Sequence, residues 1–223
     1  MRFWLTHAAL PAALLLVLTL ITEFTSLDVW LANHFFDFES RQWLGGESWW
    51  ANELLHKRGR DLIALIAIAA LLGLLLSWVS ARLRPWRRAC AYAVLCILLS
   101  TGLVFLGKKY SNVDCPWDLA LYNGNRPYVH IFADKPDDID RGRCFPGGHS
   151  SGAFSLMFLY FLLRDRRRRL AFAGLGFAIA LGSLYAFGQW TRGAHFLSHD
   201  IWSAFIAWFV ALGLYRFGFR GKV

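Results

Sequence analysis

The hydrophobic pattern of this chain consists of long apolar blocks, with little of the alternation or striping expected of a soluble domain. A helix needs about 20 predominantly apolar residues to cross a bilayer core roughly 30 Å thick. Two short windows, Ser150–Leu163 and Ile201–Tyr215, fall below this length unless their polar starts are included. The windows that meet or approach it without any Asp, Glu, Lys or Arg are Phe3–Thr22, Leu62–Ala81, Ala89–Gly107 and Leu170–Thr191.

This pattern predicts an all-α polytopic membrane protein, in which residues 1–223 form a single domain. We expect a bundle of six transmembrane helices with an extracytoplasmic loop domain and interfacial helices. The first helix is expected to be retained, because its apolar run is long and no small-residue cleavage site follows it. The outer loops then cover 26–59 and 109–147. The expected spans are 5–25, 61–81, 89–108, 148–164, 169–191 and 195–216.

Basic residues gather at four places that fall on one side of this six-helix topology. The positive-inside rule assigns that side, and with it both termini, to the cytoplasm. The net charge of +9 is therefore topological, so the bilayer is an expected partner and nucleic acid is not. A content of 57% hydrophobic and 17% aromatic residues agrees with a membrane protein. The four groups are Arg2; Arg82, Arg84, Arg87 and Arg88; Arg164 with Arg166–Arg169; and Arg216, Arg220 and Lys222.

The two outer loops differ in character. The aromatic strings "VWLANHFFDFES" and "ESWWANELLH" of the first loop are typical of interfacial helices, for which membrane anchoring is favoured over guidance of a lipid substrate. In the second loop, "DKPDDID" lacks the ligand spacing and central glycine of a calcium loop, so no metal is expected there. Cys115 and Cys144 flank this loop and are a disulfide candidate in an oxidising compartment. Cys90 and Cys96 are expected to be packing residues inside a helix.

Ionisable groups gather where the expected helices end on the outer side. Several cations beside histidines suit an anion with tetrahedral oxygens, because Lys and Arg form charge-assisted hydrogen bonds. Gly147 and Gly148 allow backbone N–H groups to approach such an anion at a helix start, and Ser150 can donate to it. The candidate cations, histidines and carboxylate are Lys108, Lys109, Arg192, His149, His195, His199 and Asp200.

Each of these residues also has a simpler interpretation. Lys108 and Lys109 are suited to anchoring a helix at the headgroup layer, and His149 alone can cap its helix. His195 and His199, spaced i and i+4, can share a metal ion. The convergence of independent helix ends on one side favours the anion site, in a scheme that requires neither a metal nor an organic cofactor.

Three short strings, in order, give the chain a family resemblance. Lys108 followed by six residues and Cys115-Pro116 is similar to K-x6-R-P, and "PGGH" at Pro146–His149 is similar to P-S-G-H. "TRGAHFLSHD" at Thr191–Asp200 resembles S-R-x5-H-x3-D. The chain thus resembles the type 2 phosphatidic acid phosphatase (PAP2) superfamily of integral-membrane lipid phosphatases. It looks most like a bacterial subgroup, some of whose members act on lipid A or polyprenyl phosphates.

The chain departs from each motif at a defined position. Cys115 stands where the family has the first arginine, Gly147 where it has serine, and Gln189 where it has the second arginine. Lys109, Arg126 and Arg143 are alternatives for the first arginine, and Arg192 for the second. The family aspartate falls on His199, with Asp200 one position later.

The resemblance implies a chemistry for these residues. His195 matches the family nucleophile, which forms a phosphohistidine, and His149 would protonate the leaving group. The orienting partner of His195 is His199 or Asp200. Helix geometry favours His199, because i+4 shares a helix face, whereas an irregular first turn would favour Asp200. Lys108, Arg192 and the backbone amides of Gly147–Ser150 would stabilise the phosphoryl oxygens.

The expected function is a metal-independent phosphatase for a lipid phosphate or diphosphate, of the lipid A, polyprenyl or phospholipid type. The resemblance implies a bacterial inner membrane and a site that faces the periplasm. Two alternatives remain open from the sequence. One is a phosphotransferase that moves phosphate between lipids, and the other is a non-catalytic protein that binds or transports an anionic lipid. The oligomeric state is not encoded in any of these motifs.

Overall fold

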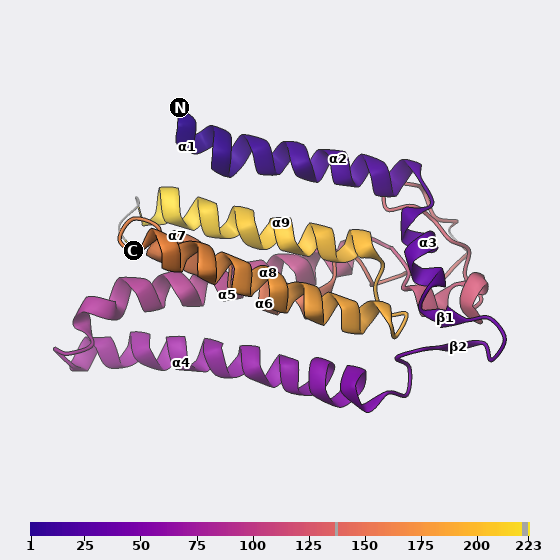
Figure 1. The fold of residues 1–223 in the computed structure, drawn as a ribbon, viewed down its shortest axis with the longest axis horizontal. Coiled ribbons are helices and arrows are strands. Elements are labelled where there is room, and N and C mark those ends of the chain that lie inside the picture. Colours follow the sequence, from indigo (N-terminus) through magenta and orange to yellow (C-terminus); the bar gives the residue numbers. More distant parts are fainter. Residues whose placement is uncertain (137, 220–222) are drawn as a thin grey trace.

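A computed structural model describes residues 1–136, 138–219 and 223 as a bundle of long helices with a small cap at one end (Figure 1). Arg220 and Lys222, which belong to the last basic group, lie outside the described residues. The cap contains a short helix and a two-stranded hairpin, and we call this end of the bundle the hairpin end. Both termini lie at the opposite end, which we call the terminal end.

Nine α-helical stretches are present in the described residues, and several continue one another through π-helical or 3₁₀ turns. The N-terminal helix combines α1, the π-helical turn Leu5–Ala9 and α2, and α4 continues the π-helical segment Trp50–Arg58. The α-helices are α1 (Arg2–Trp4), α2 (Leu10–Phe24), α3 (Leu27–Asn33), α4 (Gly59–Val79), α5 (Arg87–Tyr110), α6 (Gly148–Ser155), α7 (Phe158–Leu163), α8 (Arg168–Trp190) and α9 (Leu197–Gly213). The strands are β1 (Phe36–Asp37) and β2 (Gln42–Trp43), which pair antiparallel. Short 3₁₀ turns cover Arg84–Trp86, Pro116–Asp118 and Ala120–Tyr122, and α9 ends in a π-helical turn at Leu214–Gly218.

Five helical stretches among the described residues are long and apolar enough to cross a membrane. They confirm the prediction of an all-α polytopic membrane protein, whereas the sixth span stays a prediction. The segment in question, α6 with α7, covers only Gly148–Leu163 and packs between α5, α8 and α9. The five stretches are Arg2–Phe24, Trp50–Val79, Arg84–Tyr110, Arg168–Trp190 and Leu197–Gly218.

The second span begins earlier than the expected 61–81, since the chain is already helical from Trp50. Charged residues interrupt the apolar run there, but they do not break a helix. Glu53 and Lys57 even form an i,i+4 ion pair on its exposed side. The second aromatic string is therefore the start of this long helix and not a separate interfacial helix, which brings His56 to the hairpin end of the bundle.

The first aromatic string is only partly helical. It forms α3 and then turns into the hairpin of β1 and β2, where Phe36 pairs with Trp43. Asp37 stabilises the connecting turn by accepting a hydrogen bond from the backbone N–H of Glu39 at 2.9 Å. Together with the second loop, the hairpin builds a small apolar cluster at the hairpin end: Ala32, Phe36, Leu119, Tyr122 and Phe196.

Candidate active site

His195 lies in the turn that joins α8 to α9. Gly193 has a φ of +68°, a conformation that favours glycine, and the backbone N–H of Trp117 donates to its carbonyl at 3.0 Å. Phe196 is extended and buried in the hairpin-end cluster, so the helix begins only at Leu197. His195 therefore precedes the first helical turn, and helical spacing does not determine which side chains it meets.

The imidazole of His195 is paired with Asp200. His195 Nδ1 lies 2.9 Å from Asp200 Oδ1, and both side chains are buried. A carboxylate only accepts, so Nδ1 carries a proton, and in the neutral imidazole Nε2 then keeps its lone pair. The preference for His199 as the orienting partner was therefore wrong, because the i+4 argument assumed that His195 belonged to the helix. His199 is fully buried, packs edge-on against Phe145, and its Nδ1 has no partner in the described part of the chain.

Two further donors fix the carboxylate of Asp200. Trp190 Nε1 donates to Oδ2 at 2.7 Å, and the Ser150 hydroxyl donates to Oδ1. Gly147 packs directly against this pair: a Cβ at Gly147 would lie 2.2 Å from Asp200 Oδ1 and 3.0 Å from His195 Nδ1. The backbone N–H of Gly147 donates to the His199 carbonyl at 2.8 Å, which ties the loop before α6 to α9. The glycine is therefore required by the close approach of the carboxylate.

His149 stands at the start of α6 beside a second histidine. Its Nε2 lies 2.8 Å from the Leu55 carbonyl, so this nitrogen carries a proton and Nδ1 is left for proton exchange. The His149 ring is stacked on Tyr185, and its centroid is 4.6 Å from that of His56. His56 was missed in the sequence. Its position in a helix of mixed charge gave no local signal, because only the fold places it next to the P-G-G-H loop.

Arg192 extends the row of polar groups from the other side. Its Nη1 donates to Gln189 Oε1 at 3.1 Å, which directs the amide nitrogen of Gln189 toward His56 Nδ1, 3.4 Å away. Burial lowers the pKa of the Arg192 guanidinium, which remains a cation at neutral pH. Arg192 thus contacts Gln189, which stands where the family motif has its second arginine. This position makes Arg192 a candidate cation for a phosphoryl group.

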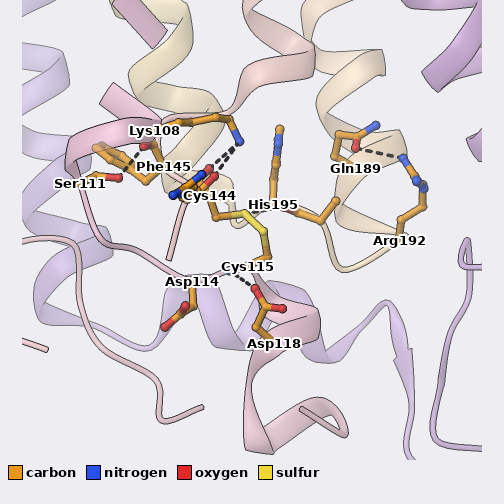
Figure 2. Close-up of a disulfide and its surroundings, with 12 residues drawn as sticks. Lys108, Ser111, Asp114, Cys115, Asp118, Cys144, Phe145, Gln189, Arg192 and His195 are labelled. Atoms are coloured by element: carbon orange, nitrogen blue, oxygen red, sulfur yellow. Dashed lines mark hydrogen bonds between the residues drawn. A yellow bond between two sulfur atoms is a disulfide. The ribbon is translucent and has the colours of Figure 1, made fainter. Parts of the chain in front are cut away.

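Lys108 approaches from the end of α5. In the view of Figure 2, His195 stands between Lys108 on one side and Gln189 with Arg192 on the other. The Lys108 amine donates to the Cys144 carbonyl at 3.2 Å, and a Cβ on Gly148 would lie 2.8 Å from Lys108 Cε. Gly148 therefore leaves room for the lysine side chain to cross the loop.

Lys109 does not belong to this site. It is exposed, and its amine lies over the ring of Tyr110 at 5.6 Å from the centroid. Consecutive helical residues point about 100° apart, so only one of the two lysines can face the loop before α6. The prediction that Lys109 binds phosphate is corrected accordingly.

Like Lys109, neither Arg126 nor Arg143 takes the place of the first-motif arginine. Arg126 is paired with Asp114 in the second loop, and this hydrogen bond raises its pKa. Arg143 is exposed. Cys115, at the motif position itself, is joined to Cys144 in a disulfide with a Cα–Cα distance of 5.1 Å, so it links the loop after α5 to the start of α6 (Figure 2).

Asp28 on α3 supports α9 from the cap. It accepts the backbone N–H of Ser198 at 3.0 Å and the Ser198 hydroxyl, and so provides the N-terminal capping of α9 from a different helix. Burial raises the pKa of Asp28 to about 6. Among the described residues, no group of three or more His, Cys, Asp or Glu side chains is arranged to hold a metal ion.

Comparison with known proteins identifies the family. The PAP2 superfamily model matches residues 88–222, which include every side chain of the site except His56. The chain belongs to the PAP2 superfamily. It is also 24% identical, over 202 residues, to the lipid A 4'-phosphatase of Francisella tularensis subsp. novicida (strain U112), with 89% of each chain covered. No solved structure matches the chain.

Membership of PAP2 confirms the resemblance seen in the three motifs and makes the protein a membrane-embedded lipid phosphatase. The candidate site is assembled from the ends of α5, α6, α8 and α9. Of the residues expected from the sequence, the structure brings together His195, Asp200, Ser150, Gly147, His149, Lys108 and Arg192.

Proposed function

We propose that this protein hydrolyses a membrane lipid phosphomonoester or diphosphate through a phosphohistidine at His195, without a metal ion. The observation that carries the proposal is the buried His195–Asp200 pair, which leaves Nε2 of His195 with a free lone pair. A nucleophile oriented by a carboxylate, beside a second histidine, is the arrangement required for double-displacement chemistry.

The first step forms a bond between His195 Nε2 and phosphorus and breaks the bond from phosphorus to the lipid oxygen. His149 gives its Nδ1 proton to the departing oxygen. In the second step His149 takes a proton from water, whose oxygen attacks phosphorus and displaces His195 Nε2. Lys108, Arg192 and the amides at the start of α6 stabilise the charge on the equatorial phosphoryl oxygens throughout.

His56 has a positioning role in this proposal. Gln189 donates to its Nδ1, so Nε2 carries the proton and serves as a donor. Placed 4.6 Å from the His149 ring, it is neutral and adds no charge that would oppose protonation of His149. We therefore expect His56→Gln, which removes the ring beside His149 but keeps a neutral side chain, to lower the rate without shifting the pH profile.

The substrate class follows from the relative and from the position of the site. The curated relative is a lipid A 4'-phosphatase, and the site lies at helix ends, where a lipid headgroup would meet the bundle. We propose a phosphorylated lipid of the lipid A type as the first substrate to test. We further propose a bacterial inner membrane, with both termini in the cytoplasm and His195 at the periplasmic face, because the termini share the arginine-rich end.

The test is phosphate release from lipid A, undecaprenyl diphosphate and phosphatidylglycerol phosphate by purified protein in the presence of EDTA. We expect release that His195→Ala abolishes and His34→Ala, a change at an exposed histidine of the cap, leaves intact. With a nitrophenyl leaving group the first step needs no general acid, whereas the second step still needs His149 to activate water. His149→Gln should therefore accumulate phosphorylated His195, which mass spectrometry detects. Transfer of label to a second lipid would instead indicate a phosphotransferase, and lipid binding without turnover a non-catalytic protein.

A further inference from the structure

A second cationic site lies at the terminal end of the bundle, far from His195. A cavity of about 690 Å³ opens between the N-terminal helix and the helices α7 and α8. Its wall includes three arginines, Arg2, Arg164 and Arg168, together with His7 and Tyr160. None of these residues takes part in the proposed phosphatase chemistry, and the PAP2 motifs do not include them.

The arginines of this cavity are held in two ways. Arg164 is fixed: its Nη1 donates to His7 Nε2 at 3.0 Å, and its guanidinium lies over the Phe3 ring at 4.7 Å. Asp165 partly offsets its charge at 3.3 Å. Arg2 and Arg168 are exposed, and within the described residues no carboxylate lies within 4.0 Å of either. Within the part of the chain that the structure describes, the cavity therefore presents two cations without a carboxylate partner beside a third that is held in place.

The cavity continues into an apolar groove. Thr6, Leu175 and Trp208 line both spaces. The groove holds about 570 Å³ between α2 on one side and α8 and α9 on the other. Its wall is almost entirely apolar, and its far end reaches Trp190 and Asp200 of the candidate active site. Trp208 Nε1 donates to the His7 carbonyl at 2.8 Å, which fixes α9 against the N-terminal helix at the junction. The cationic cavity thus opens directly into a groove whose apolar wall suits an acyl chain.

We propose that this cavity and the adjoining groove bind an anionic glycerophospholipid of the leaflet opposite to the one that meets His195. Its phosphodiester lies against Arg2 and Arg168, with Arg164 behind, and one acyl chain occupies the groove beside α2. Positive-inside topology alone predicts exposed charges at this end. It does not predict a hollow lined by cations that is joined to an apolar channel, and basic pockets between membrane helices are typical sites for phosphate headgroups. The lipid is a ligand and not a substrate, because a phosphodiester offers no phosphomonoester to His195.

The test compares two arginines that are adjacent on α8. Arg168 lines the cavity, whereas Arg169 is exposed and lies outside it. Full-length protein in detergent is titrated with phosphatidylglycerol, and binding is followed by native mass spectrometry and thermal unfolding. Removal of one headgroup-contacting cation is expected to weaken binding about fivefold in Arg168→Gln, and Arg169→Gln is expected to bind as the wild type does. Ala204→Phe, which fills the groove, is expected to weaken binding while all arginines are kept.

Several outcomes would overturn the proposal. If the two arginine variants weakened binding equally, the lipid would be attracted by the general positive charge of this end and not by the cavity. Equal binding of phosphatidylcholine would show that the lipid's negative charge is not recognised. Full competition by glycerol phosphate or inorganic phosphate would show that the cavity binds a free anion. Displacement by orthovanadate, a phosphoryl mimic for the His195 site, would place the bound lipid there instead. Binding does not require turnover, so these results stand apart from any failure of the phosphatase proposal.

Discussion

Asp200 accepts hydrogen bonds from three donors, and its replacement by asparagine perturbs them unequally. Trp190 Nε1–H is a fixed donor, the Ser150 hydroxyl can rotate, and His195 can exchange its tautomer. The single oxygen of asparagine satisfies Trp190 at the lowest cost, since leaving that buried N–H unpaired costs about 1–3 kcal/mol. The amide NH₂ then faces His195 Nδ1 and forces the proton onto Nε2.

The consequence of this exchange is a nucleophile without its lone pair. Substitutions that impose the wrong histidine tautomer in a triad lower kcat by about 10⁴-fold. For Asp200→Asn we therefore expect a loss of about 10³- to 10⁴-fold, equivalent to about 4–5.5 kcal/mol of transition-state stabilisation. The fold should survive, because the volume of the side chain and the hydrogen bond from Trp190 are kept.

The assay is phosphate release by Asp200→Asn, with Trp190→Phe added in a second variant. Removal of the indole donor frees the asparagine oxygen to turn toward His195, so the double variant should regain about tenfold or more, the energy of one hydrogen bond. In the wild-type background Trp190→Phe should only lower activity. The tautomer argument fails if Asp200→Asn stays within tenfold of the wild type, or if His199→Gln is the more damaging change.

Three other substitutions test separate parts of the structure. Gly147→Ser, which restores the family serine, should lower activity about 10²-fold by displacing Asp200 from His195, and a gain of activity would contradict the contact. Lys108→Gln should cost about 10²- to 10³-fold in kcat, whereas Lys109→Gln should be neutral in the same phosphate-release assay. Burial raises the folded pKa of Asp28 from 3.8 to about 6. Above pH 6 its charged form therefore destabilises the fold by about 3 kcal/mol, and this penalty disappears as the pH falls toward 4. Asp28→Asn should remove that dependence from the thermal unfolding temperature measured between about pH 7 and pH 5, and an unchanged slope would assign the dependence to other groups.

The sequence was sufficient for features that depend on local composition. Apolar runs of bilayer length predicted the polytopic helical class, and the order of three motifs predicted the family. It was insufficient where a contact depends on where a helix begins. The i+4 argument places His195 in the helix, whereas Phe196 is extended and α9 starts after it, so the predicted partner of His195 is one residue away from the observed one.

Other errors have the same physical origin. The charges between Glu53 and Asp61 marked the end of an apolar run but not the end of a helix, so His56 was hidden in a supposed loop. Lys108 and Lys109 are equivalent in composition, and only the rotation of α5 separates them. Side chains that meet across 90 or more residues, such as His56 and His149, have no signature in a single sequence.

The close approach at Gly147 has a consequence for how this branch of the superfamily diverged. The family pattern has serine at this position and aspartate four residues after the nucleophile, whereas here the serine is lost and the aspartate arrives one residue late. Asp200 Oδ1 occupies the space that a side chain at 147 would fill, so we expect the two departures to depend on each other. Neither motif position should tolerate reversion alone, and relatives that carry glycine at the first position should carry the displaced aspartate as well.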